Sequence, residues 1–123
     1  MSIVTVLIED SSTIREALIP TMRELADLEV VAVADTAVDA IQTLSMHAWQ
    51  LVVVDLFLKK GSGLEVLRHC TNRSPDQHMV VLTNYATPDI RQKCLALGAT
   101  AVFDKSTELD DFFGFCSELF TNG

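Results

Sequence analysis

Five short apolar runs alternate with five longer segments of helical spacing along this chain of 123 residues. The runs are rich in Val, Ile and Leu and lack the polar–apolar alternation of a half-buried strand. They cover residues 3–8, 29–34, 51–54, 78–83 and 100–103. Strands that are apolar throughout are typical of a sheet covered on both faces, in which crossover helices join parallel strands. The sequence therefore predicts an α/β fold built from five βα repeats.

The segments between the runs carry helix-start and helix-stop signals. The first helix is predicted to begin at Ser11 or Ser12. Thr13 and Glu16 fit a capping box in this helix, and the helical spacing places Leu25 on its inward face. Further helices are predicted over residues 36–47, 63–71, 87–98 and 107–120.

Composition narrows the classes of protein that this chain can represent. An apolar fraction of 49% argues against disorder, and residues 1–123 are predicted to form one domain. The net charge of −8 disfavours direct binding to nucleic acid or to an anionic membrane. Cys70, Cys94 and Cys116 form neither a disulfide framework nor a metal motif, which fits thiols in a reducing cytoplasm. No signal peptide and no membrane-spanning stretch is predicted, so a cytoplasmic location is expected.

Polar side chains stand at the carboxyl ends of the predicted strands. Glu9 and Asp10 follow the first strand, and Asp55 follows the third. Thr83 ends the fourth strand, and Lys105 comes shortly after the fifth. Because ligands of parallel α/β folds bind outside the carboxyl ends of the strands, these five residues are candidates for a functional site.

Each candidate also has a structural explanation when it is taken alone. Glu9 and Asp10 could complement the dipole of the next helix, and Lys105 could be a solvated loop cation. Asp35, at the end of the second strand, is predicted only to cap the helix that follows. Three carboxylates in one crevice repel one another, however, and a hard divalent cation with oxygen ligands resolves that repulsion. A lysine and a hydroxyl suit the oxygens of a phosphoryl group, so Asp55 is predicted to be the nucleophile that forms an acyl phosphate.

These residues and their spacing resemble the receiver domain of two-component response regulators over essentially the whole chain. The motifs that carry the resemblance are "ED" at 9–10, "VVVD" at 52–55, Gly63, "VVLT" at 80–83, "ALGA" at 96–99 and the lysine of "FDKS" at 103–106. The resemblance implies a flavodoxin-like (βα)5 fold, a doubly wound parallel sheet with strand order 2-1-3-4-5.

The resemblance also implies a metal site and a phosphorylation site. Mg²⁺ (or Mn²⁺) would be bound by Asp10, Asp55 and the backbone carbonyl of Phe57, with Glu9 acting through water. A sensor histidine kinase or a phosphotransfer protein would pass a phosphoryl group from a phosphohistidine to Asp55. Such a domain is not an enzyme beyond its own phosphotransfer and dephosphorylation.

A switch and an output surface follow from the same resemblance. Thr83 and Lys105 would bind the phosphoryl group and relay its presence to the face of the fourth helix, fifth strand and fifth helix. An output protein or domain would dock there, a homodimer is possible, and no direct contact with nucleic acid or membrane is expected. Two alternatives remain: an interaction module that works without phosphate, and a metal-dependent phosphatase, for which no segment is long enough to form a cap. The chain is either a stand-alone regulator or an excised receiver.

Three positions around the predicted site depart from the family pattern. Lys59 stands where Pro is common, and Asn84 stands where Ala or Gly usually follows the switch threonine. Ser106 stands where Pro usually follows the lysine in a cis bond. A cis bond before a serine costs about 3 kcal/mol, so the isomer of the Lys105–Ser106 bond is left open.

Three further positions, together with Asn84, are predicted to modulate the switch. Val102 occupies the place of the usual aromatic switch residue, and Phe103 cannot substitute because adjacent strand residues face opposite ways. Phe57 and Tyr85 stand two residues after the predicted phosphorylation site and the switch threonine. In the family these two places control the access of water to the acyl phosphate, and two bulky rings predict slow loss of the phosphoryl group.

Overall fold

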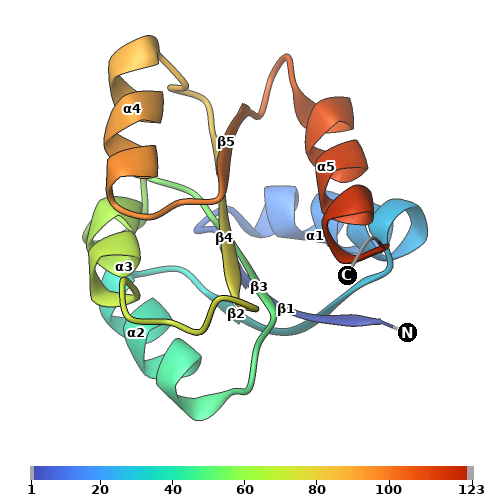
Figure 1. The fold of residues 1–123 in the computed structure, drawn as a ribbon, viewed down its shortest axis with the longest axis horizontal. Coiled ribbons are helices and arrows are strands. Elements are labelled where there is room, and N and C mark those ends of the chain that lie inside the picture. Colours follow the sequence, from blue (N-terminus) through green and yellow to red (C-terminus); the bar gives the residue numbers. More distant parts are fainter. Residues whose placement is uncertain (1, 122–123) are drawn as a thin grey trace.

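A five-stranded parallel sheet forms the centre of the computed structural model, which describes residues 2–121 (Figure 1). The order of the strands is β2-β1-β3-β4-β5, and every neighbouring pair is parallel. The strands are β1 (Ile3–Ile8), β2 (Leu28–Ala34), β3 (Leu51–Val54), β4 (His78–Thr83) and β5 (Ala101–Asp104). The predicted flavodoxin-like fold and strand order are therefore confirmed.

Five helices cover the sheet from both sides (Figure 1). Two of them, α1 and α5, pack on one face, and the other three pack on the opposite face. The helices are α1 (Ser12–Ala26), α2 (Ala37–Met46), α3 (Gly63–His69), α4 (Pro88–Ala96) and α5 (Leu109–Thr121). Each lies within three residues of the range predicted for it, because strand-to-helix transitions coincide with the changes in hydrophobic periodicity.

The burial of the strands explains why they lack polar alternation. In β1, Val6 and Ile8 join the core under α2, α3 and α4, whereas Leu7 between them joins the core under α1 and α5. All four residues of β3 are buried in the same two-sided manner. Each such side chain contributes about 1.5–3 kcal/mol when it is fully buried. A sheet stabilised on both faces holds its carboxyl edge rigidly, and the candidate site lies at that edge.

The start of α1 differs from its prediction. Ser11 is the N-cap, and its hydroxyl accepts a hydrogen bond from the backbone N–H of Ile14 at 3.2 Å. Thr13 lies inside the helix, so the predicted capping box of Thr13 and Glu16 is wrong. Leu25 is 53% exposed and not inward as predicted, because the buried stripe of α1 follows the spacing of Leu18, Met22 and Ala26.

The start of α2 also corrects a prediction. Thr36, not Asp35, caps this helix, and its hydroxyl accepts from the backbone N–H of Asp39 at 3.1 Å. The backbone carbonyl of Asp35 instead accepts a hydrogen bond from the N–H of Lys59 at 3.0 Å. Asp35 therefore connects β2 to the loop after β3, close to the carboxyl edge of the sheet.

Candidate functional site

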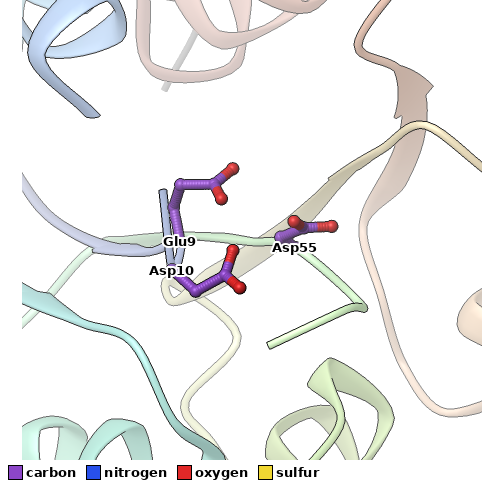
Figure 2. Close-up of side chains that lie close together, drawn as sticks. All are labelled: Glu9, Asp10 and Asp55. Carbon is purple, nitrogen blue, oxygen red and sulfur yellow. The ribbon is translucent and has the colours of Figure 1, made fainter. Parts of the chain in front are cut away.

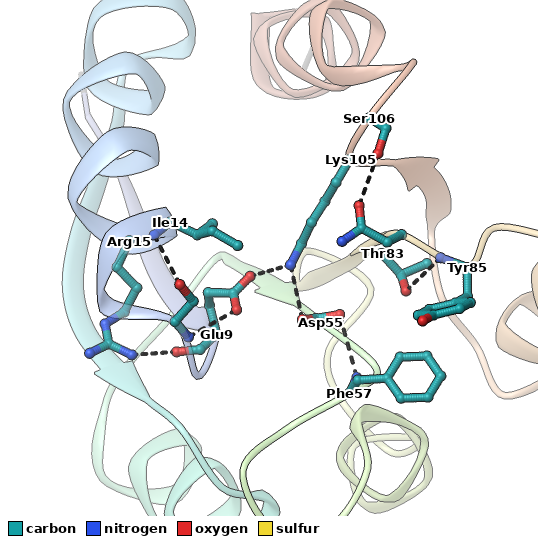
Figure 3. Close-up of polar contacts among 11 residues, drawn as sticks. Glu9, Ile14, Arg15, Asp55, Phe57, Thr83, Tyr85, Lys105 and Ser106 are labelled. Carbon is teal, nitrogen blue, oxygen red and sulfur yellow. Dashed lines mark hydrogen bonds and ion pairs between the residues drawn. The ribbon is translucent and has the colours of Figure 1, made fainter.

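The predicted site residues converge at the carboxyl edge of the sheet (Figure 3). Glu9 follows β1, Asp55 follows β3, Thr83 ends β4, and Lys105 follows β5. Glu9, Asp55 and Thr83 are buried, with exposed fractions of 2%, 7% and 0%. Parallel strands bring their carboxyl ends to one edge, which is why residues far apart in the sequence meet here.

Three carboxylates form one cluster at this edge (Figure 2). One carboxylate oxygen from each of Glu9, Asp10 and Asp55 lies within 4.8 Å of the others. Asp10 is exposed, so the cluster opens to solvent on that side. An all-oxygen, acidic set with an open side fits Mg²⁺, which binds one or two carboxylates and keeps several waters. The backbone N–H of Phe57 points to Asp55 Oδ1 at 3.4 Å, and the metal-binding role of the Phe57 carbonyl stays a prediction.

Lys105 extends from the end of β5 into the carboxylate cluster (Figure 3). Its ammonium Nζ donates to Asp55 Oδ2 at 2.9 Å and forms a second ion pair with Glu9 Oε1. Its backbone N–H donates to the Thr83 carbonyl at 3.0 Å, which fixes the loop after β5 to the end of β4. The lysine side chain is 10% exposed, so its charge is held inside the crevice.

The charges of the crevice do not balance. Burial raises the pKa of Glu9, although bonds from Lys105 and from the Ser11 amide oppose this shift. Burial lowers the pKa of Lys105, but its hydrogen bonds with Glu9 and Asp55 outweigh that effect, and the net shift is upward. Glu9 therefore holds its proton more firmly than usual because it is buried, and Lys105 does so because it is bonded to two carboxylates. Three carboxylates face one ammonium group in the crevice, and this imbalance favours uptake of a cation.

Asp10 is the carboxylate that Lys105 does not neutralise. Within residues 2–121 its side chain makes no hydrogen bond or ion pair, while Glu9 and Asp55 both contact the lysine. We expect Asp10→Asn to raise the free energy of unfolding of the metal-free protein by roughly 1 kcal/mol, because it removes the repulsion between the Asp10 carboxylate and the other two carboxylates of the cluster. The same change should weaken Mg²⁺ binding and block phosphorylation.

The effect of Asp10→Asn is measured by urea unfolding with and without Mg²⁺. Asp39→Asn is the matched control, since it removes one exposed carboxylate from the first turn of α2, outside the cluster. A metal-free Asp10→Asn protein that is less stable than wild type, with unchanged Mg²⁺ affinity, would assign Asp10 a structural role at the start of α1.

Thr83, the predicted switch threonine, is held by its own loop. The Thr83 hydroxyl accepts a hydrogen bond from the backbone N–H of Tyr85 at 3.2 Å. Two departures from the family pattern meet beside it, because the Ser106 hydroxyl donates to Asn84 Oδ1 at 3.1 Å (Figure 3). This bond joins the loop after β4 to the loop after β5. No cis peptide bond occurs within residues 2–121, so the Lys105–Ser106 bond is trans.

Sequence reasoning missed the bond between Asn84 and Ser106. The signal for it was present, since both residues depart from the family pattern on either side of the same crevice. Lys59, the third departure, is exposed and makes its backbone bond to Asp35.

Two aromatic rings flank the crevice on its outer side. Phe57 and Tyr85 are 55% and 58% exposed, and their ring centroids lie 4.6 Å apart at an interplanar angle of 55°. Val102 is buried under α4, whereas Phe103 lies on the other face of β5 and packs against Phe112 at 6.0 Å. Phe103 therefore cannot take the place of an aromatic residue at position 102, as predicted.

This geometry agrees with a comparison of the chain with known protein families. Residues 5–114 match the family described as the response regulator receiver domain. The chain belongs to this family. Receiver domains bind Mg²⁺ at an acidic pocket, and Glu9, Asp10 and Asp55 form an acidic cluster in this receiver domain. Receiver domains interact with histidine kinases and output domains and are generally not enzymes.

Relatives of this receiver domain include regulators of transcription. It is 27% identical to the transcriptional regulatory protein CitB of Klebsiella pneumoniae, over 84% of this chain and 43% of that protein. It is 26% identical to the DNA-binding transcriptional activator DevR/DosR of Mycobacterium tuberculosis, over 76% of this chain and 43% of the activator. The receiver domain thus spans about half the length of the curated relatives that it matches.

Solved structures share the fold of this receiver domain. A LuxR-family DNA-binding response regulator from Staphylococcus aureus gives a TM-score of 0.85 at 19% identity, covering 95% of this chain and 98% of that chain. The response regulator domain of Thermotoga maritima CheB gives a TM-score of 0.78 at 20% identity, covering 99% of this chain and 93% of that chain.

Two expectations from the sequence concern contact with nucleic acid and with a membrane. The names of the relatives are in tension with the expectation of no direct contact with nucleic acid, which stays a prediction for residues 1–123 only. Within the part of the receiver domain that the structure describes, no helix has the length and apolar character needed to cross a membrane.

Proposed function

We propose that this receiver domain accepts a phosphoryl group on Asp55 from the phosphohistidine of a sensor histidine kinase or a phosphotransfer protein. The reaction depends on Mg²⁺ and switches the binding of an output protein or domain on the face of α4, β5 and α5. The observation that supports this proposal most directly is the contact of Lys105 Nζ with Asp55 Oδ2 at 2.9 Å, within a cluster of three carboxylates.

The proposed reaction transfers the phosphoryl group from nitrogen to oxygen. A carboxylate oxygen of Asp55 attacks phosphorus, the bond from phosphorus to the imidazole nitrogen breaks, and its electron pair returns to the imidazole. Asp10, Asp55 and the Phe57 carbonyl would hold Mg²⁺ directly and Glu9 through water. The bound ion would offset the negative charge of the carboxylates and phosphoryl oxygens.

Two further residues would hold the product. Lys105 already lies beside Asp55, and its ammonium would exchange part of its contact with the carboxylates for a phosphoryl oxygen. The Thr83 hydroxyl would leave the Tyr85 amide and donate to another phosphoryl oxygen. The protein thereby converts a covalent change at Asp55 into a change in the loop after β4.

The function is tested by measuring phosphoryl incorporation. The protein is incubated with a phosphorylated histidine kinase or a small acyl phosphate, with Mg²⁺ or with a chelator, and its intact mass is recorded. We expect a gain of one phosphoryl group that requires Mg²⁺. No gain from either kind of donor would favour an interaction module that works without phosphate.

The lifetime of the acyl phosphate should depend on the rings at the crevice. Neither Phe57 nor Tyr85 can orient an attacking water as a carboxylate does, and the phenol of tyrosine is a poor base near neutral pH. The Asn84 amide oxygen already accepts a bond from Ser106. We therefore expect slow self-dephosphorylation in the wild type and acceleration by up to about tenfold in Phe57→Asn, a barrier change of about 1.4 kcal/mol.

This expectation is checked by following the decay of the phosphorylated protein in excess Mg²⁺. Tyr85→Phe is the control, because it keeps the ring and removes only the hydroxyl, and its decay should match that of the wild type. If the wild type decays as fast as Phe57→Asn, the rings do not shield the acyl phosphate.

A further inference from the structure

Arg91 on α4 binds three separate segments on one side of the molecule. Its Nε donates to the Ala86 carbonyl at 2.8 Å, in the loop between β4 and α4. Its Nη1 donates to the Val102 carbonyl at 3.0 Å, in β5, and its Nη2 forms an ion pair with Glu108, just before α5. We call Arg91 and these three partners, Ala86, Val102 and Glu108, the Arg91 clasp. The clasp spans the face on which α4, β5 and α5 lie side by side (Figure 1).

The Arg91 clasp contributes little to the free energy of folding, but it fixes the relative positions of the segments that it joins. Arg91 and Glu108 side chains are 34% and 31% exposed, and ion pairs at that exposure contribute little to the free energy of folding. A guanidinium carries five donors in a fixed plane, so it can fix the relative positions of several acceptors at once. Glu108 continues the connection, because the same Oε1 accepts from the Asp104 N–H at 2.9 Å at the end of β5.

One end of the clasp adjoins the switch threonine. The Thr83 hydroxyl now accepts from the Tyr85 N–H, and Tyr85 precedes Ala86, whose carbonyl Arg91 holds. If the hydroxyl turns to a phosphoryl group, the Tyr85 amide loses its acceptor and the loop has to rearrange. A movement of the Ala86 carbonyl then acts on the guanidinium directly.

The β5 end of the clasp lies at Val102, where the family usually has an aromatic switch residue. Val102 has neither a ring nor a hydroxyl that could alternate between buried and exposed positions, and the residue is only 8% exposed. Its backbone carbonyl, however, is bound by Arg91. We propose that Arg91 couples the position of the Thr83 loop to β5 and α5, and so performs in this chain the relay that residue 102 cannot perform. This inference rests on the proposed function, because it needs a phosphoryl group at Asp55.

A second connection between the same two loops competes with the clasp. The bond from Ser106 to Asn84 also joins the segment after β4 to the segment after β5. It is a single bond between two exposed side chains, whereas the clasp reaches two backbone carbonyls and a carboxylate. The two routes make different predictions and are separated by substitution.

The coupling is measured by amide chemical shifts in ¹H–¹⁵N spectra, with Mg²⁺ and beryllofluoride as a stable mimic of the phosphoryl group. Tyr85 and Ala86 report on the near end, and Leu109 and Phe112 report on the far end in α5. In the wild type we expect shifts at both ends, with the rotamer of Val102 unchanged. In Arg91→Gln the near shifts should persist and the far shifts should fall at least about threefold.

Three companion variants make the result specific. Lys93→Gln removes a positive charge from the exposed side of the same helix and should behave as wild type. Arg91→Lys keeps the charge but not the planar fork, so it should lose the far shifts as Arg91→Gln does. Glu108→Ala removes the ion pair at the α5 end of the clasp and keeps the Arg91 side chain. It serves as the test if Arg91→Gln folds poorly.

Each outcome decides between the routes. Far shifts that survive in Arg91→Gln or in Glu108→Ala would overturn the coupling while leaving the proposed function intact. Far shifts that vanish in Ser106→Ala and persist without the guanidinium would assign the relay to Asn84 and Ser106. A wild type with no shift at Tyr85 and Ala86 would overturn the proposed function, and the coupling with it.

Discussion

Replacing Asp55 by Asn is expected to abolish phosphoryl transfer to the receiver domain. An amide oxygen carries no charge and is a far weaker nucleophile than a carboxylate, so the acyl phosphate cannot form. Asp55 directly follows β3 and lies in the carboxylate cluster, where its Oδ2 is 2.9 Å from Nζ of Lys105. After incubation with a phosphorylated kinase or a small acyl phosphate in Mg²⁺, the intact mass of Asp55→Asn should be unchanged, while the wild type gains one phosphoryl group.

A matched control separates this effect from a general loss of charge. Asp35 also stands at the carboxyl end of a strand but outside the carboxylate cluster, so Asp35→Asn should be labelled like the wild type. Urea unfolding of all three proteins shows whether each is folded under the labelling conditions. Labelling of a folded Asp55→Asn protein to the wild-type extent would place the nucleophile on another residue.

Replacing Gly63 by Ala is expected to destabilise the protein and to disturb the proposed phosphorylation site at Asp55. A Cβ atom built on Gly63 lies 2.3 Å from the Asp55 carbonyl oxygen and 3.0 Å from the Leu56 Cα. Both are backbone atoms, so no side chain can move aside to make room. Overpacking of this kind costs about 1–3 kcal/mol, and we expect the upper end of that range in the free energy of unfolding. The displaced atoms belong to Asp55 and its neighbour, so phosphoryl incorporation should slow as well.

Gly114→Ala is the control for the Gly63 substitution. It makes the same chemical change inside α5, where an added Cβ meets nothing within 4 Å. Alanine in a helix interior should stabilise the protein by about 0.5–1 kcal/mol relative to glycine. Urea denaturation of the two variants should therefore give shifts of opposite sign. A Gly63→Ala protein with wild-type stability and wild-type labelling would show that the backbone relaxes at no cost.

The fold and the meeting of the site residues followed from rules that act locally or through simple topology. Apolar runs such as residues 51–54 identify buried parallel strands, and parallel strands bring Glu9, Asp55 and Lys105 to one edge. Neither step depends on the detailed packing of side chains. The prediction that these groups lie together therefore needed only the order and direction of the strands, whereas their roles with metal and phosphate stay predictions.

Other features depend on packing that a sequence does not encode locally. Ser11, Ser12 and Thr13 are all good N-cap residues, and Ser11 takes the role because its backbone is extended while the helix begins at Ser12. The contacts of Arg91 with Val102 and Glu108 depend on how α4 is placed along β5. Such contacts are decided by the relative placement of two elements, about which hydrophobic periodicity carries no information.

The ion pairs of Lys105 also determine when the crevice can form as the chain is synthesised. They join this lysine to Glu9, which lies 96 positions earlier in the sequence, and to Asp55, which lies 50 positions earlier. While the nascent chain still lacks β5, the carboxylates can meet at the sheet edge only without their ammonium partner. Contacts of such long sequence separation form late in folding, because the intervening loop must first be closed. The complete crevice, with its ammonium group in place, therefore forms only after β5 has been synthesised and has paired with β4.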